Sequence, residues 1–398
     1  MKTLLLARPD HSTFLYEGLR NNSEIDVKYH TFSAFRKGSL LNKWKPSVKS
    51  VDSEVEISYG FTIFHRLLDF LNKQVTFDYY RIENQISEYF FKQILQKYSD
   101  EVNIIHYWPI YCYQSIKEFQ QQYPRTKFLA DVYAAHPTYV QEILEPEFDK
   151  YGLSFQDSYF IKGNSRDLKA LENVENILVP SEYMAEIYQK YYPNTKIFVA
   201  NYGLLNSSII NTKPNNRKIS EPLKLVFVGK VSIEKGCIYL LEALEKLKDN
   251  NVQLDMIGEI ETSQLNIFKR YFNISNINFL GRLPNLKILE ILPNYHTFVL
   301  PSLSDAYSLA VSEALNNKLP VIITENVGNK EDIYKFRIGA VCKVKDLDSL
   351  ISAILLFKDE TYRQFLISNI DNFVEYCQKN SYPSKVISIY KTLIKATT

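Results

Sequence analysis

Residues 301–327, PSLSDAYSLAVSEALNNKLPVIITENV, carry a pattern that changes from strand to helix and back to strand. The apolar residues 298–300 directly before this stretch predict a buried strand, which the following proline would stop. Residues 302–305 include side chains that commonly cap helices, and apolar residues then recur at helical spacing through 309–315. A second apolar run at 321–323 predicts the next strand. Such a strand–helix–strand unit is typical of a parallel α/β sheet.

Two carboxylates lie on this unit, Asp305 at the start of the expected helix and Glu313 eight residues later. On a helix that separation is about 12 Å along the axis. The start of a helix presents unpaired amides and about half a positive charge, so the amides of residues 306–308 would attract a phosphate. A carboxylate can accept hydrogen bonds from two neighbouring ribose hydroxyls, which suits Glu313, while a sugar suits Asp305. The spacing therefore fits one extended ligand with a diphosphate in its middle, and it equally fits a Glu313 that only caps or pairs on an ordinary helix.

The same stretch resembles the E-x7-E motif of retaining GT-B glycosyltransferases of the large family 4 group. The residues that match the family pattern are Pro301, Ser302, Glu313, Ala314, Pro320 and Val321. Asp305 stands where the family has its first glutamate and is one methylene shorter. The resemblance implies that Glu313 holds the ribose of a nucleotide and that Asp305 contacts the donor sugar. The residues that it implies at the diphosphate are Ala306, Tyr307, Ser308 and Leu309.

A second loop, GKVSIEKG at residues 229–236, resembles the G-R-L-x-x-E-K-G loop of the same family, with Lys230 in place of the usual arginine. Gly229 supplies the turn, and the two cations, Lys230 and Lys235, suit a diphosphate near a helix start. We also expect a catalytic role for Lys235, because its charge would stabilise the diphosphate as it leaves. Taken alone, two lysines at this spacing are commonly two solvated side chains.

Two further segments of the C-terminal half resemble nucleotide-binding parts of the family. Glu259 follows the expected strand 254–258, where relatives have a turn near the nucleotide. Arg282 and Leu283 lie in a segment similar to the family's F-x-G-x-V, whose backbone is expected to pair with the base. Backbone contacts leave no side-chain record, so the sequence does not specify the base.

The N-terminal half offers candidate residues at the ends of its expected strands, where open α/β sheets bind ligands. Arg8 and His11 follow the strand Thr3–Ala7 and would serve either an acceptor or the cap of the next helix. His136 also follows a strand, and it resembles a family histidine that faces the donor sugar across the cleft. We therefore expect His136 to be catalytic, and a core or capping histidine is the alternative. His106 stands at another strand end.

The resemblance covers residues 175–396 closely and the first half loosely, and it implies an α/β protein with the GT-B fold. Two Rossmann-like domains would face each other across a cleft, with the nucleotide on the C-terminal domain and the acceptor on the N-terminal one. The length of 398 residues suits two domains. The predicted parts are an N-terminal domain 1–205, a polar linker 206–222, a C-terminal domain 223–380 and a final helix within 381–398 that crosses back onto the first domain.

The composition is that of a soluble globular protein, with 45% hydrophobic and 23% charged residues and a formal net charge of +2. This balance gives no steering toward nucleic acid. The cysteines lack metal-ligand spacing and indicate a reducing cytoplasm; they are Cys112, Cys237, Cys342 and Cys377. No Asp-x-Asp cluster stands where a metal-dependent transferase would need one, so we expect neither metal nor cofactor. The start of the chain predicts a buried strand rather than a signal sequence, and no segment is apolar enough to span a bilayer.

Residues 33–73 combine basic and apolar side chains. Those of 36–49 are Arg36, Lys37, Lys43, Lys45 and Lys49, alternating with Leu40, Leu41 and Trp44. Such a mixture could contact a membrane surface or a lipid-linked acceptor. An exposed loop followed by an ordinary amphipathic helix is the alternative.

The predicted function is transfer of a sugar, with retained anomeric configuration, from a UDP- or GDP-sugar to a glycan, a lipid-linked acceptor or another hydroxyl. The enzyme would be cytoplasmic, with peripheral membrane contact through residues 33–73. Another GT-B enzyme, such as an epimerase or a phosphorylase, is disfavoured by Glu313 and Lys235. A GT-B-like subunit that only binds a glycan or a partner transferase is the alternative, because Asp305 and Lys230 depart from the family pattern.

Overall fold

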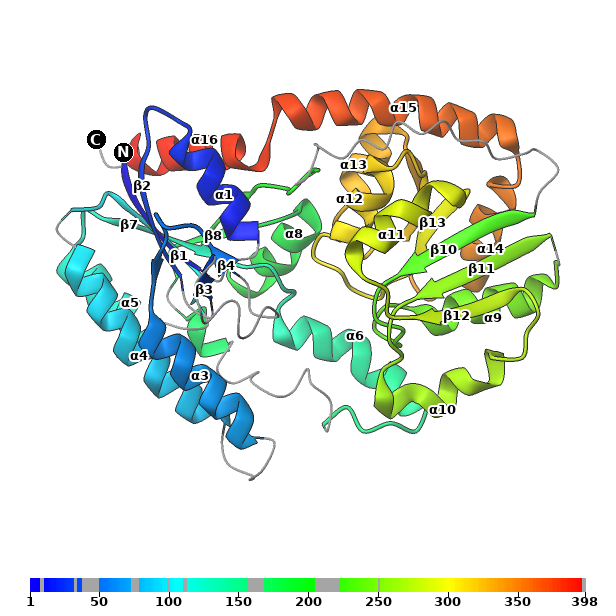
Figure 1. The fold of residues 1–398 in the computed structure, drawn as a ribbon, viewed down its shortest axis with the longest axis horizontal. Helices are drawn as coiled ribbons and strands as arrows, with labels where there is room; N and C mark the ends of the chain where they lie inside the picture. The colour runs from blue at the N-terminus through cyan, green and yellow to red at the C-terminus, as the bar shows by residue number, and fades with distance from the viewer. Residues whose placement is uncertain are drawn as a thin grey trace.

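The computed structural model of the chain contains two parallel β-sheets, each packed against helices, which lie side by side in Figure 1. The residues that it describes are 1–7, 11–31, 34–37, 50–72, 79–98, 101–109, 113–156, 168–172, 174–204, 222–249 and 251–395. The N-terminal half is the blue and cyan part on the left of the view, and the C-terminal sheet lies on the right. The predicted α/β class is confirmed.

The N-terminal sheet has seven strands, all paired in parallel, in the order β5-β2-β1-β6-β7-β8-β9. Their bounds are Glu56–Ile57 (β5), Asp26–Thr31 (β2), Lys2–Ala7 (β1), Ile104–Tyr107 (β6), Lys127–Asp131 (β7), Asn176–Val179 (β8) and Lys196–Val199 (β9). The strand β6 is buried along its length and β1 over all but its first residue, as the continuous apolar runs of a parallel sheet predict. A separate parallel pair joins β3 (Phe35–Arg36) to β4 (Ser50–Val51).

Helices follow most of these strands and pack around the sheet. They are His11–Arg20 (α1), Tyr59–Asn72 (α3), Tyr79–Tyr98 (α4), Tyr113–Gln122 (α5), Pro137–Lys150 (α6) and Glu182–Tyr191 (α8). The helices α3 and α4 pack on each other at the lower edge of this half in Figure 1. Their position leaves one side of α3 facing away from the rest of the molecule.

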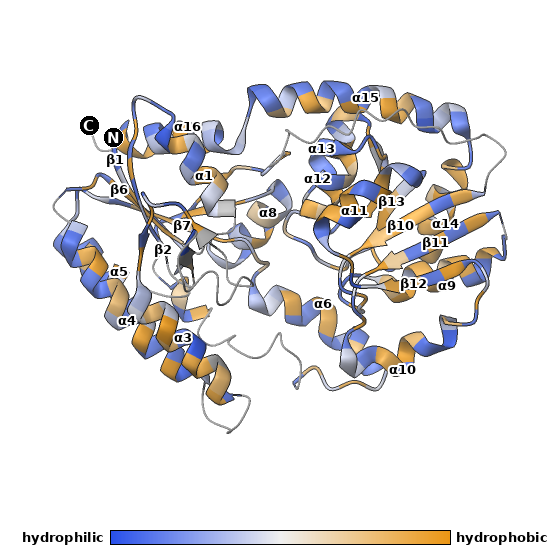
Figure 2. Cartoon of the chain, viewed as in Figure 1, coloured by the Kyte–Doolittle hydropathy of each residue, from blue (hydrophilic) through white to orange (hydrophobic). Residues whose placement is uncertain are grey.

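The C-terminal sheet has six parallel strands in the order β12-β11-β10-β13-β14-β15, which is the 3-2-1-4-5-6 order of a Rossmann fold. Their bounds are Ile277–Gly281 (β12), Val252–Ile257 (β11), Leu223–Val228 (β10), Thr297–Leu300 (β13), Val321–Thr324 (β14) and Gly339–Cys342 (β15). These strands are mostly hydrophobic in Figure 2. The strand order reverses between β10 and β13, and sheets of this kind bind ligands beyond the carboxyl ends of the strands at that point.

The helices of this half include the one predicted between two strands by the opening stretch, since β13, α12 and β14 follow one another. The helices are Cys237–Leu247 (α9), Leu265–Phe268 (α10), Asn285–Ile291 (α11), Leu309–Asn316 (α12), Lys330–Phe336 (α13) and Leu347–Leu356 (α14). Short 3-10 turns occur at Thr262–Gln264 (η2), Lys269–Tyr271 (η3) and Leu292–Asn294 (η4).

The last two helices join the halves. Figure 1 shows α15 (Glu360–Lys379) along the C-terminal half and α16 (Tyr382–Lys395) over the N-terminal half. The helix α16 packs against α1, and a Cβ added to Gly18 would lie only 2.3 Å from Pro383, so this crossing requires glycine. The predicted return of the final helix is confirmed. The predicted linker, residues 206–222, lies outside the described part except for its last residue, so the domain boundaries stay predictions.

A further connection is made by α6, which belongs to the N-terminal half by sequence and extends toward the C-terminal half in Figure 1. Leu144 and Phe148 are buried in the hydrophobic cluster of the C-terminal half. Glu147 is 6% exposed, accepts a hydrogen bond from the Tyr239 hydroxyl (2.6 Å) and pairs with Lys345 (2.9 Å). The sequence pattern did not indicate this contact between the halves.

Candidate functional site

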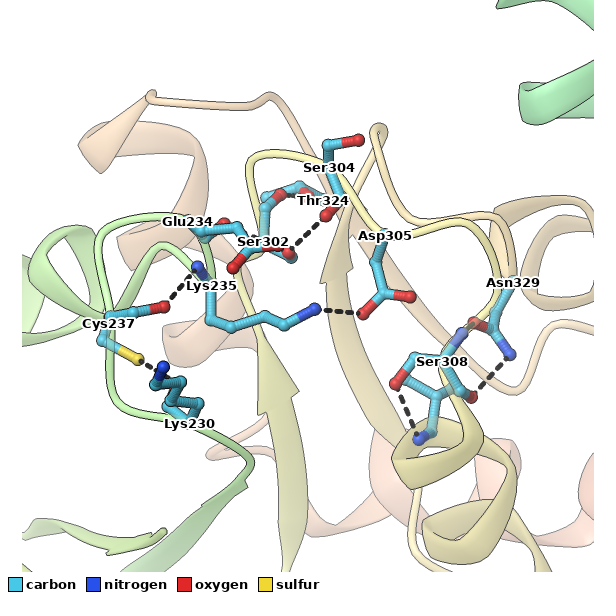
Figure 3. A network of polar contacts seen from close by, with 12 residues as sticks. Lys230, Glu234, Lys235, Cys237, Ser302, Ser304, Asp305, Ser308, Thr324 and Asn329 are labelled. Carbon is cyan, nitrogen blue, oxygen red and sulfur yellow. Dashed lines mark hydrogen bonds and ion pairs between the residues drawn. The ribbon is translucent and has the colours of Figure 1, made fainter. Parts of the chain in front are cut away.

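The loop between β13 and α12 carries Asp305 and ends at Ser308, whose side chain caps α12. Asn329 holds the backbone of Ser308: its Oδ1 accepts from the Ser308 amide (2.7 Å), and its Nδ2 donates to the Ser308 carbonyl (3.3 Å). Figure 3 shows these contacts beside Asp305. The Ser308 amide, expected at the diphosphate, is thus engaged here. The amides of Leu309 and Ala310 come next, in the first turn, whose N–H groups have no acceptor within the helix.

Lys235 and Asp305 form an ion pair, with 2.9 Å between Nζ and Oδ2 (Figure 3). Their side chains are 24% and 15% exposed. Burial disfavours the charge of Lys235, but the carboxylates of Asp305 and Glu234 outweigh burial and raise the pKa of Lys235 above its ordinary value. Lys235 is therefore a cation at neutral pH, paired with the carboxylate that the sequence assigns to the sugar.

A pocket of about 300 Å³ opens at the carboxyl ends of β10, β11 and β12. It is lined by the predicted residues Gly229, Lys230, Glu259, Arg282 and Leu283, together with Val228, Ile257, Gly258 and Ile288. Gly258 allows two loops of the pocket to touch. The φ of Gly258 is +150°, and a Cβ added there would lie 1.7 Å from the Gly229 carbonyl oxygen. The structure thus brings together predicted residues from three separate segments of the sequence.

Two exposed cations line this pocket. Lys230 pairs with Glu261, and Arg282 lies 3.8 Å from Glu259; the two cationic side chains are 56% and 78% exposed. Water screens such pairs, and each contributes about 0–1 kcal/mol. Either cation could therefore exchange its partner for an anionic ligand at small cost.

Glu313 on α12 accepts a hydrogen bond from Nδ2 of Asn285 at the start of α11 (3.1 Å). Burial raises the pKa of Glu313, and the bond from Asn285 acts in the opposite direction. Asn285 comes two residues after Leu283, so this bond ties Glu313 to the rim of the pocket. The sequence analysis did not predict Asn285 as a site residue. Its position next to the expected base-binding segment could have indicated it.

His136 is 3% exposed and lies among tyrosines at the end of α8. Its ring stacks on Tyr191 with 3.9 Å between centroids, and its Nε2 lies 3.3 Å from the Tyr192 hydroxyl. Burial lowers the pKa of His136 to about 4, so the ring is neutral at pH 7. These contacts place His136 in a packing environment within its own half, and its role at the donor sugar stays a prediction.

His106 is fully buried, with Nδ1 2.7 Å from the Tyr390 hydroxyl of α16 and Nε2 3.3 Å from the Asp131 carboxylate. It packs the sheet against the final helix. Arg8 lies outside the described residues, as does the side chain of His11, which begins α1. The acceptor roles of these two residues stay predictions.

The N-terminal half also contacts the loop that carries Asp305. Ser181, which caps α8, donates from Oγ to the carbonyl of Ala306 (2.7 Å). The Tyr183 hydroxyl lies 3.1 Å from the Ser304 Oγ. Because both halves hold this loop, a change in their relative position would also move Asp305.

Tyr307 turns its side chain toward the boundary between the halves. It is 5% exposed, its hydroxyl donates to Asp332 (2.9 Å), and its ring packs edge-on against Tyr202 with 5.7 Å between centroids. Only its backbone is left to serve a phosphate, as the sequence predicted for this segment.

Within the described residues, no group of three or more His, Cys, Asp or Glu side chains is arranged to hold a metal ion. None of the helices in that part of the chain combines the length and apolar character that a bilayer crossing demands. The independence from metal stays a prediction.

Comparison with known proteins gives matches in both sequence and structure. Residues 208–373 match the family model described as Glycosyl transferases group 1. Protein CapJ of Staphylococcus aureus is 24% identical over 270 residues, which cover 64% of this chain and 66% of CapJ. UDP-Gal:alpha-D-GlcNAc-diphosphoundecaprenol alpha-1,3-galactosyltransferase of Escherichia coli is 27% identical over 178 residues, which cover 43% of this chain and 44% of that protein. The sucrose-phosphate synthase structure from Thermosynechococcus elongatus superposes with a TM-score of 0.63 at 15% identity, over 100% of both chains, and this likeness shows the fold alone.

Proposed function

The chain has the GT-B fold and its residues 208–373 match the model of the glycosyl transferases group 1 family, and from this premise we propose that it is a retaining glycosyltransferase. It would transfer a sugar from a nucleotide sugar to a hydroxyl acceptor. The observation that carries this proposal is the Lys235–Asp305 pair, which joins the loop after β10 to the loop before α12, close to the pocket that Lys230 and four other predicted nucleotide residues line (Figure 3).

In this proposal the nucleotide lies in the pocket, and the Glu313 carboxylate accepts hydrogen bonds from its ribose hydroxyls. Asn285 keeps that carboxylate in place. The diphosphate lies against the first turn of α12, at the amides of Leu309 and Ala310, where the helix dipole favours negative charge.

Lys235 has the central electrostatic task. As the bond between sugar and diphosphate breaks, negative charge grows on the diphosphate, and a fixed cation stabilises it. When a diphosphate draws the ammonium of Lys235, the carboxylate of Asp305 is released to accept hydrogen bonds from the sugar. Lys230 adds a second, exposed cation at the nucleotide pocket.

We propose a UDP-sugar as the first donor to test, with a GDP-sugar as the alternative, and a lipid-diphosphate-linked glycan as acceptor. The Escherichia coli relative supports this choice because its name carries UDP-galactose and a diphosphoundecaprenol-linked acceptor. The cationic groups around the site support activity without a metal. We place the reaction in the cytoplasm, which is supported by Cys237, Cys342 and Cys377 being free and buried.

His136 enters the proposal as a residue that holds the sugar when the halves close. Its alanine variant tests this role: transfer should fall at least tenfold, about 1.4 kcal/mol of barrier. A variant with lower thermal stability and the transfer rate of the wild type would leave His136 with packing alone.

The experiment that tests the function is a screen of nucleotide sugars with the purified protein. Binding to the native state should raise the melting temperature with UDP or GDP. Slow hydrolysis of the matching nucleotide sugar should follow. Binding without turnover of any donor would favour the alternative, a GT-B-like subunit that only binds.

A further inference from the structure

A second pocket opens on one face of the C-terminal sheet, near the amino ends of β10, β11 and β12. Its volume is about 220 Å³, and its polar lining residues are Lys224, Gln253, Asp255, Asn278, Asn294 and Tyr295. The nucleotide pocket lies at the opposite, carboxyl ends of the same strands. The path from Gln253 to Gly258 in the nucleotide pocket covers five residues of extended chain, which is about 17 Å. The two pockets are therefore separate.

The floor of this second pocket is polar, whereas a parallel sheet is usually apolar on both faces. Every second residue of β11 from Val252 to Met256 is fully buried. Between them, Gln253 and Asp255 are only partly buried, and they belong to the other face of the sheet. The neighbouring strands place Lys224 opposite Gln253 and Asn278 opposite Asp255. Polar side chains of three strands thus lie together on one face.

Two neighbours hold the Asp255 carboxylate in place. Tyr295, which is 7% exposed, donates from its hydroxyl to Oδ2 (2.7 Å), and Asn278 donates from Nδ2 to Oδ1 (2.8 Å). Burial and the bond to Asp255 raise the pKa of Tyr295, so its hydroxyl keeps the proton that it donates. Each carboxylate oxygen has two lone pairs and can accept one more hydrogen bond. Asp255 is thus a fixed acceptor in the wall of the pocket.

Two amide side chains of the pocket are available to a ligand. Those of Gln253 and Asn294 make no hydrogen bond to any part of the chain that the structure describes. Each amide has a carbonyl oxygen that accepts and an NH₂ group that donates. The pocket therefore offers both donors and acceptors beside the Asp255 carboxylate.

This combination indicates the chemistry of the ligand. Lys224 and Asp255 have opposite charges, so the pocket favours neither a simple anion nor a simple cation. A hydroxyl group donates and accepts as an amide does, and a carboxylate can accept from two neighbouring hydroxyls. An apolar ligand would cover the amides of Gln253 and Asn294 and leave them without partners, which is unfavourable. The volume of about 220 Å³ is below the roughly 300–1,000 Å³ of pockets for drug-sized ligands, so it suits a single sugar ring.

We propose that this pocket is a second saccharide site, which binds one pyranose unit of a glycan through Asp255, Gln253 and Asn294. A glycan held there would stay near the nucleotide pocket between rounds of transfer, because a second contact raises its effective concentration. That role rests on the proposed function, whereas the binding itself does not.

The test is saturation-transfer difference NMR on the purified full chain, with glucose, galactose and N-acetylglucosamine as probes. At least one of these sugars should give a saturable signal, and excess UDP should leave it unchanged, because UDP is expected in the other pocket. Gln253→Leu keeps the approximate size of the side chain and removes its amide, so binding should weaken about tenfold, the effect of one lost hydrogen bond. Asn294→Ala should weaken binding in the same direction. The matched control is Asn273→Ala, at an exposed asparagine of the same half outside the pocket, which should bind as wild type does.

Melting temperatures show whether each variant keeps its fold, and Asn294→Ala, at an exposed position, keeps the test decisive if Gln253→Leu does not fold. Absence of a saturable signal from all three sugars would overturn the proposal, and so would equal binding by wild type and the folded pocket variants. Loss of the sugar signal in excess UDP would overturn it by placing the sugars at the nucleotide pocket. Glycine has both charges and no hydroxyl, so binding of glycine in place of the sugars would overturn it in favour of a zwitterion site. The probes are used without a donor, so their failure leaves the proposed transferase activity intact, and a failed transfer assay leaves the binding result intact.

Discussion

Replacement of Lys235 by alanine should weaken the binding of a nucleoside diphosphate more than any other single change in the loop of residues 229–236. The Lys235 Nζ lies 2.9 Å from the Asp305 carboxylate, and both side chains are largely buried. The substitution removes the cation proposed to meet the diphosphate. It also leaves the Asp305 carboxylate without its partner, so a phosphate would meet an uncompensated negative charge.

The expected magnitude follows from the bond that is lost. A hydrogen bond to a charged group contributes roughly 1.5–3 kcal/mol. Since 1.4 kcal/mol is a factor of ten, UDP should bind about 10- to 150-fold more weakly. Lys230 provides the matched control in the same loop: it is 56% exposed and pairs with Glu261. An exposed pair contributes about 0–1 kcal/mol, so Lys230→Ala should weaken binding by less than about fivefold.

Isothermal titration of UDP into wild type, Lys235→Ala and Lys230→Ala measures these affinities, with melting temperatures recorded to confirm folding. Wild-type affinity in Lys235→Ala would refute the assignment of this lysine to the diphosphate. A larger loss in Lys230→Ala than in Lys235→Ala would refute the argument that burial decides which cation matters.

Three other outcomes are expected. Glu313→Ala should weaken UDP binding by roughly 1.5–3 kcal/mol, because the ribose loses a charge-assisted acceptor; unchanged calorimetric affinity for every nucleotide that binds wild type would exclude the ribose role. Burial moves the pKa of His136 from 6.5 to about 4, so the unfolded chain binds a proton that the folded chain does not, and stability should fall as pH falls through that window. His136→Phe should reduce this pH dependence of the melting temperature, and an unchanged slope would contradict the linkage. Transfer should persist in excess EDTA; full loss with recovery on adding magnesium or manganese would overturn the charge role given to Lys230 and Lys235.

Local sequence patterns specified much of this fold. Apolar runs located β13 and β14, Pro301 marked the end of β13, and the recurrence from 309 to 315 located α12. These signals are readable because a strand or helix is determined largely by neighbouring residues. The resemblance at residues 229–236 predicted Gly229 and Lys230 as nucleotide contacts. Both residues line the pocket that the structure contains.

Contacts between distant elements were not readable in the same way. Asn285, Asn329 and Ser181 each act on the site through a hydrogen bond to another element. A side chain with ordinary capping chemistry gives no signal of such a partner. The same holds for His136, whose place near a strand end was evident, whereas its stack on Tyr191 depends on how α8 packs.

The central claim is that this site turns over a nucleotide sugar, and the most direct measurement is UDP release from UDP-sugars by wild type and Asp305→Asn, with and without a lipid-linked acceptor. Asp305→Asn keeps the size of the side chain and removes its charge. We expect wild type to release UDP, and to release it faster when the acceptor is present. The variant should release UDP at least tenfold more slowly, which corresponds to about 1.4 kcal/mol of activation barrier, while its affinity for UDP stays near that of wild type. UDP binding by wild type with no release from any UDP- or GDP-sugar would contradict the claim, and so would equal release by wild type and Asp305→Asn.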